Sequence, residues 1–247
     1  MLPEEEELAR LEAEQTVLED EVTSAELALE TTKTEIAQFQ HRYYRTVGRL
    51  FAQLDELDAK LAHKEAERAP DSSPAQAKAA AAQKQSEKSA EEAGLVEALP
   101  TPPPEITPEL KHAYRQAAKL IHPDRATTES ERLRRTTLMA QVNRAYEIGD
   151  QTAIEKLISE FGQDPEAIAG ADVASRIVKS IRRIAQFRRR LGEVQKQMDA
   201  MQQTEIFSLK KTIEETEALG GTPLEDLAKK LMQQLSERMI ELEIGNA

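Results

Sequence analysis

YRQAAKLIHPDRA, residues 114–126, is a basic, amphipathic run that breaks at a proline. The residue before a proline is pushed out of the α region, so a helix through this run should end near His122. Thr107-Pro108-Glu109 offers a good start for that helix, with threonine as the N-cap and proline at the first helical position. We therefore predict a helix to about Ile121 that ends on His-Pro-Asp. This triplet is either an ordinary helix stop or a contact site for another protein.

Two more helices are expected to follow this break. The pattern predicts one from about Ser130 to Ile148 and a shorter one from Thr152 to Phe161. The buried face of the longer helix should hold Leu133, Leu138, Val142, Ala145 and Tyr146. Packing against the preceding helix would give a hairpin whose core is Tyr114, Ala118, Ile121, Val142 and Tyr146. We assign this helical unit to residues 106–162.

Basic residues line one face of the helix that precedes the proline. Lys111, Arg115 and Lys119 recur every four residues and therefore share that face. Such a stripe can steer association with an acidic partner surface. Pro123 restricts the backbone of the loop, and Asp124 can pair with cations across an interface. Each feature alone also has a simpler explanation, because a basic helix face is usually just solvated and a His-Pro-Asp turn can simply end a helix.

Together, these residues carry a resemblance to a known family. LKHAYRQAAKLIHPDR, residues 110–125, resembles the second helix and signature loop of a J domain, the hallmark of the DnaJ family of co-chaperones. MAQVNRAYEIGD, residues 139–150, resembles the end of the third helix of that domain. The matching residues are Lys111, Tyr114, Arg115, Ala118 and Lys119, then His122-Pro123-Asp124, then Asn143, Ala145, Tyr146 and Glu147.

The resemblance implies both a fold and a function. The helix pair would be an antiparallel hairpin with the His-Pro-Asp loop at its tip. The loop and the basic helix face would engage a DnaK-class chaperone and stimulate its ATP hydrolysis. His122, Pro123 and Asp124 would be the essential loop. The positive face would consist of Lys111, Arg115, Lys119 and Arg125. This chain would carry no catalytic chemistry, because the partner hydrolyses ATP.

The sequence also departs from the J-domain pattern. Before Pro108 lies LVEALPTPPP, residues 95–104, which does not resemble the short first helix of a J domain with its tyrosine pair. That helix is missing or replaced, and part of the N-terminal coiled coil is the candidate replacement. The chain therefore resembles specialised J proteins, in which other segments choose the target. The alternative is a non-catalytic coiled-coil scaffold whose J-like hairpin has lost partner stimulation.

An apolar seam with alternating steps of three and four residues is typical of a coiled coil and dominates the N-terminal region. Its positions are Leu8, Leu11, Gln15, Leu18, Val22, Ala25, Leu29, Thr32, Ile36, Phe39, Tyr43, Val47, Leu50, Leu54, Leu57 and Leu61. Two successive steps of four between Phe39 and Val47 form a stutter, which locally unwinds a left-handed supercoil. Tyr43, Tyr44 and Phe51 gather at the stutter beside Gly48. We interpret these aromatic residues as packing residues rather than as a docking patch.

The remaining segments complete four predicted domains. Residues 1–69 form the long N-terminal helix, and residues 70–105, rich in Ala and Pro, form a flexible linker before the J-like unit. Residues 163–247 form a C-terminal helical hairpin. Within it, Asp172 opens a long helix that Gly220-Gly221 ends, and Thr222 begins the last helix.

The pairing of the long helices stays open at the level of sequence. The first 70 residues are strongly acidic, whereas the segment Arg176–Arg190 is strongly basic. These segments either face each other or are solvated separately. Contact between them can lie within one chain or between chains, and a homodimer through the first helix is equally plausible. Polar Gln15 and Thr32 in the seam can fix the register of such a pair.

Composition narrows the fold and function classes. The 247 residues contain no cysteine and only 4% aromatic residues, so disulfides, cysteine zinc sites and a large sheet are not expected. We therefore predict an all-α protein with long coiled-coil helices flanking a small J-domain-like hairpin. Its four histidines, His41, His63, His112 and His122, lie apart without zinc-ligand spacing. No nucleotide-binding or nucleophile motif is present. Neither an enzyme nor a metal or other cofactor is expected.

Charge and hydropathy restrict the partners. A net charge of −12 disfavours a general nucleic-acid binder. The acidic start MLPEEEELARLE is not a signal peptide, and no apolar run approaches the ~20 residues that a membrane span needs. We expect a cytoplasmic protein that binds a DnaK-class chaperone and an unidentified client protein, and neither nucleic acid nor membrane.

Overall fold

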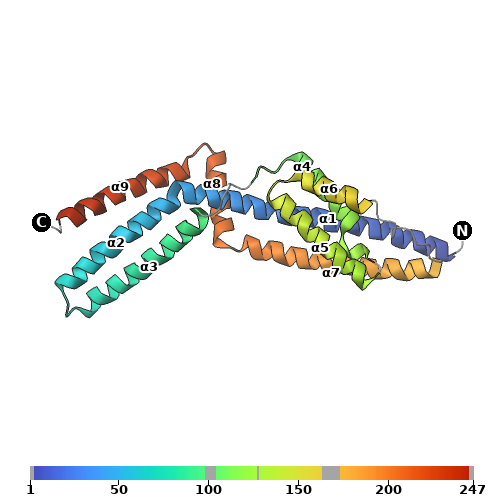
Figure 1. Cartoon of the computed structure of the whole chain (residues 1–247), viewed down its shortest axis with the longest axis horizontal. Coiled ribbons are helices and arrows are strands. Elements are labelled where there is room, and N and C mark those ends of the chain that lie inside the picture. Colours follow the sequence, from blue (N-terminus) through green and yellow to red (C-terminus); the bar gives the residue numbers. More distant parts are fainter. Residues whose placement is uncertain (1–2, 98–103, 127, 163–172, 245–247) are drawn as a thin grey trace. The chain divides into compact units, whose positions relative to one another are not determined.

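The structure is a computed structural model, and it describes residues 3–97, 104–126, 128–162 and 173–244. Within these residues the chain is all-α, as predicted, and contains no strand. The helices are α1 (Pro3–Tyr43), the π-helix η1 (Tyr44–Gly48), α2 (Arg49–Arg68), α3 (Ser73–Glu97), α4 (Pro108–Ile121), the 3₁₀-helix η2 (Pro123–Arg125), α5 (Glu129–Glu147), α6 (Gln151–Gly162), α7 (Val173–Gln202), α8 (Glu205–Ala218) and α9 (Pro223–Ile244) (Figure 1). No helix in this described part of the chain combines the length and the apolar character needed to cross a bilayer.

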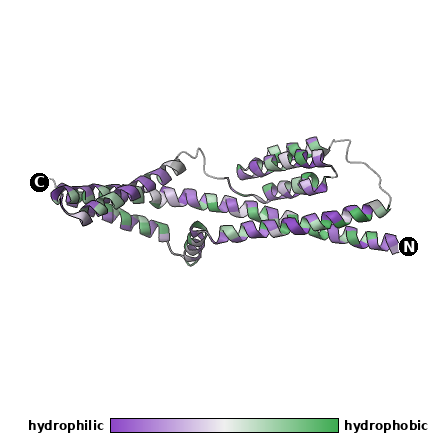
Figure 2. Cartoon of the chain, turned by 90° about the horizontal axis from the view of Figure 1, so that it is seen from below, coloured by the Kyte–Doolittle hydropathy of each residue, from purple (hydrophilic) through white to green (hydrophobic). Residues whose placement is uncertain are grey.

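The chain divides into two compact units. Unit 1 combines Met1–Glu35 with Pro103–Thr204, and unit 2 combines Ile36–Pro102 with Glu205–Ala247. The division therefore passes through α1 instead of following the four consecutive segments expected from the sequence. Hydrophilic and hydrophobic residues are interspersed along the helices (Figure 2).

In unit 1, α4 and α5 form the predicted helical pair. Thr107 caps α4, because its hydroxyl accepts a hydrogen bond from the Leu110 N–H at 3.1 Å. The helix ends where expected, since His122 precedes a proline and has a ψ of 133°. Thr128 caps α5 in the same way, accepting from the Glu131 N–H at 3.2 Å.

The core of this helical pair is apolar and well covered. Its buried residues are Leu27, Leu110, Ala113, Tyr114, Ala117, Ala118, Ile121, Met139, Val142, Ala145, Tyr146 and Ile154. They include all five residues named for the hairpin core, and the rings of Tyr114 and Tyr146 meet edge to face at 5.0 Å. Leu133 was wrongly assigned to this face, because its side chain is 59% exposed. At about 100° per residue, Leu133 lies on the side of α5 opposite Val142, and Met139 is buried instead.

α6 covers this core from the third side. Gly149 adopts a left-handed φ of 72° between α5 and α6, and a Cβ there would lie 2.5 Å from the Pro104 side chain. Asp150 then starts α6 by accepting a hydrogen bond from the Ala153 N–H at 2.9 Å. α1 contributes Leu27 to the same cluster, and Thr31 Oγ1 lies 2.8 Å from the Tyr146 hydroxyl.

The acidic and basic segments face each other within one chain. Ion pairs join Arg176 of α7 to Glu12 of α1 at 2.6 Å, and Arg188 to Glu14. Both helices also bury apolar side chains in unit 1, among them Val22, Leu29, Phe187 and Val194. Of the arrangements that the sequence left open, the structure shows contact between these two segments inside one chain.

The segment predicted as a flexible linker is different in the structure. Residues 73–97 form α3, and the chain turns back at residues 69–72 so that α3 packs along α2 in unit 2. Small side chains make this contact close, because Ala62 and Ala66 of α2 meet Ala79 of α3. The alanine-rich composition therefore favours a helix with a small-residue face, whereas residues 98–103 lie outside the described part.

The stutter in the apolar seam coincides with η1. A π-helix accommodates one extra residue per turn, which realigns the apolar stripe after the two steps of four. Gly48 is required there, because a Cβ would lie 2.4 Å from Cδ1 of Tyr44. Tyr43 and Phe51 pack beside the buried cluster of Phe39, Val47 and residues of α8 and α9, which agrees with a packing role.

The C-terminal hairpin begins later than expected. The long helix predicted to extend from Asp172 to Gly220 is interrupted after Gln202, and α8 begins at Glu205. The apolar series jumps by five residues from Met201 to Ile206, so a continuous helix would place the two side chains on different faces. Asp172 itself lies outside the described residues. α8 and α9 are joined through Gly220, which has a φ of 86°.

Candidate partner-binding site at the His-Pro-Asp loop

The His-Pro-Asp loop is built by its own backbone. Arg125 N–H donates to the His122 carbonyl at 3.1 Å, and Ala126 N–H donates to the Pro123 carbonyl at 3.1 Å. The His122 side chain caps this short turn, because its Nδ1 accepts a hydrogen bond from the Asp124 N–H at 3.2 Å. The loop therefore has a defined shape, with the histidine ring folded over the residues that follow it.

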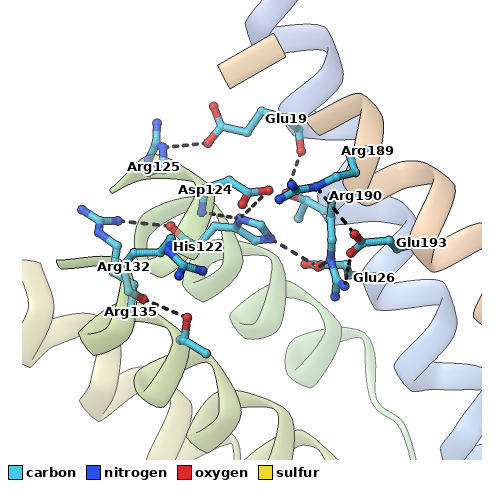
Figure 3. Close-up of polar contacts among 12 residues, drawn as sticks. Glu19, Glu26, His122, Asp124, Arg125, Arg132, Arg135, Arg189, Arg190 and Glu193 are labelled. Atoms are coloured by element: carbon cyan, nitrogen blue, oxygen red, sulfur yellow. Dashed lines mark hydrogen bonds and ion pairs between the residues drawn. The ribbon is translucent and has the colours of Figure 1, made fainter. Parts of the chain in front are cut away.

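His122 is buried beneath α1 and α7. It is 5% exposed, and its ring lies 6.4 Å from the ring of Phe187 of α7. In a neutral ring Nδ1 is the acceptor, so Nε2 carries the proton and donates to Glu26 Oε1 of α1 at 3.2 Å (Figure 3). Both ring nitrogens are thus engaged within the chain.

Glu26 connects the loop to the basic helix. Its Oε1 also accepts a hydrogen bond from Arg190 Nε of α7 at 2.7 Å (Figure 3). Burial alone would raise the pKa of Glu26, but the interactions with His122 and Arg190 outweigh it and lower that pKa. The carboxylate therefore stays ionised near neutral pH in an almost fully buried place.

Asp124 is in a less favourable environment. Its side chain is 16% exposed, and its Oδ2 lies 3.6 Å from His122 Nδ1 without a hydrogen bond to any described residue. Burial raises the pKa of Asp124, His122 partly offsets this, and the nearby charge of Glu26 raises it further. The negative charge of Asp124 consequently costs stability in this arrangement.

The basic residues of the predicted positive face divide into two groups. Lys119 Nζ forms an ion pair with Asp20 of α1 at 2.6 Å, and Arg125 Nε forms one with Glu19 of α1 at 2.9 Å. Lys111 is half-buried in the first turn of α4, and Arg115 is exposed at the middle of the helix. The structure thus brings His122, Pro123, Asp124, Lys119 and Arg125 together beneath α1 and leaves Lys111 and Arg115 apart from them.

Three residues at this site were not anticipated from the sequence. Arg135 of α5 donates to the Leu120 carbonyl at 2.9 Å and pairs with Glu131 at 2.7 Å, which fixes the end of α4. Glu26 and Arg190 are the other two. A signal for Glu26 existed, because Val22, Glu26 and Leu29 follow helical spacing and place one carboxylate on an apolar face.

A cavity of about 380 Å³ lies beside the loop in unit 1. Its lining combines polar and apolar surface and includes Glu26, His122, Asp124, Asn143 and Arg190. Among the described residues, no three histidine or carboxylate side chains are grouped as a metal site would need. The arrangement is therefore one of paired charges and hydrogen bonds, suited to recognition by contact.

Comparison with known proteins identified no relative. No protein-family model matches the chain, no curated protein matches it, and no solved structure matches it.

Proposed function

We propose that this chain is a specialised J-domain-like co-chaperone, which recruits a DnaK-class chaperone through the His-Pro-Asp loop and stimulates its ATP hydrolysis. The chain itself supplies contacts rather than catalysis. The long helices would bind a client protein or a second copy of the chain.

The observation that carries this proposal is the position of the triplet. His122, Pro123 and Asp124 lie in the turn between α4 and α5, and four residues of the J-domain pattern share one buried core: Tyr114, Ala118, Ala145 and Tyr146. The Tyr114 hydroxyl also donates to Asn143 Oδ1 at 3.1 Å, so two residues of the sequence pattern contact each other directly. A pattern that matched by chance would have no reason to converge on one hairpin.

Asp124 gives independent support for a functional role of the loop. A buried carboxylate with a raised pKa and an oxygen that lacks a hydrogen bond destabilises the fold. An asparagine or serine would end the helix equally well at lower cost. Residues that break a local rule in this way are expected at functional sites.

A second candidate is the coiled-coil scaffold with a J-like hairpin that no longer stimulates a chaperone. The burial of His122 favours it, because a ring that is 5% exposed is not available to a partner in this arrangement. The two candidates differ in one measurable property, which is stimulation of the ATPase.

The test is single-turnover ATP hydrolysis by a DnaK-class chaperone from the same organism, with and without this protein. We expect the wild-type chain to accelerate hydrolysis and His122→Gln to abolish the acceleration. His112→Gln is the matched control, because His112 is exposed on the same helix. Circular dichroism of each variant checks that its helices are intact.

Acceleration that survives in His122→Gln would count against the loop as the contact site. No acceleration by the wild type or by the opened variants described below would leave the scaffold as the better candidate. Equal loss in His122→Gln and His112→Gln would point to damage of α4 rather than to loss of a partner contact.

A further inference from the structure

The residues proposed to bind the chaperone are already bound inside the chain. Glu26 accepts from His122, Asp20 pairs with Lys119, and Glu19 pairs with Arg125. All three acidic residues lie on one segment of α1, residues 19–26. An acidic surface of a chaperone would need the same three basic groups.

We propose that the acidic segment 19–26 of α1 acts as an internal competitor of the chaperone and keeps the His-Pro-Asp loop closed until α1 is displaced. This inference rests on the function proposed above and adds its regulation. The partner it implies is an acidic protein surface that replaces Glu19, Asp20 and Glu26 at the loop. Arg190 of α7 contributes to the closed state by fixing the Glu26 carboxylate.

The contacts between segment 19–26 of α1 and the His-Pro-Asp loop hold the closed state only weakly, so the loop can open. Lys119 and Asp20 are 53% and 56% exposed at their side chains, and exposed ion pairs of this kind contribute little. The second oxygen of Glu26 and Oδ2 of Asp124 are buried without a hydrogen bond to a described residue, which leaves the interface imperfectly satisfied.

Opening need not unfold the helical pair. Its apolar core is built almost entirely from α4, α5 and α6, and α1 contributes only Leu27 among the described buried residues. The contacts of segment 19–26 with the loop are instead polar. Displacing α1 would break these ion pairs and hydrogen bonds and would also expose Val22, Leu27 and Leu29 of α1. The cluster shared by α4, α5 and α6 would stay assembled, which makes the closed and open states two arrangements of a folded chain.

The first measurement needs no chaperone. Diethylpyrocarbonate modifies exposed histidine rings, and mass spectrometry locates each modified residue. In the wild-type chain we expect His122 to react at least tenfold more slowly than the exposed His112 on the same helix. Glu26→Gln and Asp20→Lys should accelerate the reaction at His122 and leave His112 unchanged. Glu21→Lys is the matched control, because Glu21 is an exposed neighbour of Asp20 that carries the same charge.

The second measurement repeats the ATPase assay with the same variants. We expect Glu26→Gln to raise stimulation by about tenfold at subsaturating chain concentration, because it weakens a buried charge contact. Asp20→Lys should raise it by about threefold, since the pair it breaks is exposed. The Asp20→Lys variant should also fold normally, because the Asp20 side chain lies largely in solvent.

The two measurements separate the possible outcomes. Faster reaction at His122 together with higher stimulation in both variants, and neither in Glu21→Lys, supports the competition. A wild-type His122 that reacts as fast as His112 overturns it, because the loop is then open without help. Variants that expose His122 without raising an existing stimulation also overturn it, while the proposed function stands. Exposed His122 with no stimulation in any variant overturns the proposed function, and the competition with it.

Discussion

The two ends of α4 present their basic side chains in different ways. Lys111 in the first turn is half-buried and Arg115 at the middle is exposed, whereas at and just beyond the helix end Lys119, His122 and Arg125 each face a carboxylate of α1. The basic residues are regularly spaced in the sequence, but the structure gives the two groups different surroundings. If the loop has the proposed function, the accessible end would attract the charged partner from solution, and the covered end would bind it after α1 has moved.

Removal of the common core should have the largest effect, because the core supports both ends. Ile121 is fully buried between α4, α5 and α6, and Ile121→Ala should destabilise the helical pair by about 2–5 kcal/mol. Amide hydrogen exchange of α4 and α5 measures this locally, which is preferable where two units need not unfold together. Ile148→Ala is the control, since its side chain is 62% exposed, and it should change stability by less than about 0.5 kcal/mol. Equal losses in the two variants would contradict the described core.

The second largest effect should come from substitutions at the covered end of α4, where α1 lies over the loop. Glu26→Ala leaves His122 and Arg190 buried without their acidic partner, so we expect the closed arrangement to lose about 3 kcal/mol. The loss should appear as faster hydrogen exchange at the Arg125 and Ala126 amides, while α6 keeps its protection. Exposed Glu21→Ala should leave the same amides unchanged. Unaltered exchange in Glu26→Ala would show that the loop does not depend on α1.

A pH titration should separate the two buried carboxylates of the covered end. The pKa of Glu26 is lowered in the folded chain, so its contribution to stability is present above its unfolded pKa and is lost as the pH falls through the folded pKa. The pKa of Asp124 is raised, so stability linked to its protonation is present below its unfolded pKa and is lost as the pH rises through its folded pKa. At pH 7 Glu26→Gln should therefore destabilise the chain, and Asp124→Asn should stabilise it by about 1 kcal/mol.

Thermal melts of both variants between pH 3 and pH 7 provide the measurement. The differences from the wild type should have opposite signs at pH 7, and each should shrink over the pH range in which its own wild-type carboxylate becomes protonated. If Asp124→Asn lowers the melting temperature at pH 7, the Asp124 carboxylate is better satisfied than its surroundings indicate. The gain in stability should accompany a loss of chaperone stimulation, if the loop has the proposed function.

The sequence predicts local features of α4 and α5 well because their causes are local. Thr107 and Thr128 are caps, Pro123 stops a helix, and the spacing of Tyr114, Ile121 and Val142 defines one apolar face. The prediction for Leu133 is wrong because nine residues separate it from Val142, which places the two side chains on opposite sides of a helix. The prediction of a flexible linker differs from the structure because alanine alone carries little hydrophobic signal. A row of alanines nevertheless allows the close approach of a partner helix.

The covered state of the loop was not predicted, and the reason is physical. Charge balance indicated that an acidic and a basic segment attract each other, but it could not select which carboxylates meet which cations. That choice depends on the rotation of α1, which places Asp20 and Glu26 toward the loop and leaves Glu21 in solvent. Contacts between residues about a hundred positions apart, such as His122 and Glu26, leave no trace in spacing within one helix.

The smallest effect should arise at the accessible end of α4. A substitution there should change the rate of partner binding and leave the stability of the chain nearly unchanged. Arg115→Ala removes an exposed cation and should change the stability of the chain by less than about 0.5 kcal/mol. It should slow association with a DnaK-class chaperone by a few-fold at low salt, and the difference should vanish near 1 M salt, where the Debye length is about 3 Å.

Lys119→Ala offers the contrast, because it weakens both the contact with Asp20 and the contact with the chaperone, so the two losses partly offset each other. Stopped-flow association rates at several salt concentrations distinguish the two residues. If Arg115→Ala and Lys119→Ala show the same salt dependence and the same exposure of His122, the two ends of α4 act as one surface, and the division between a steering end and a covered end has to be abandoned.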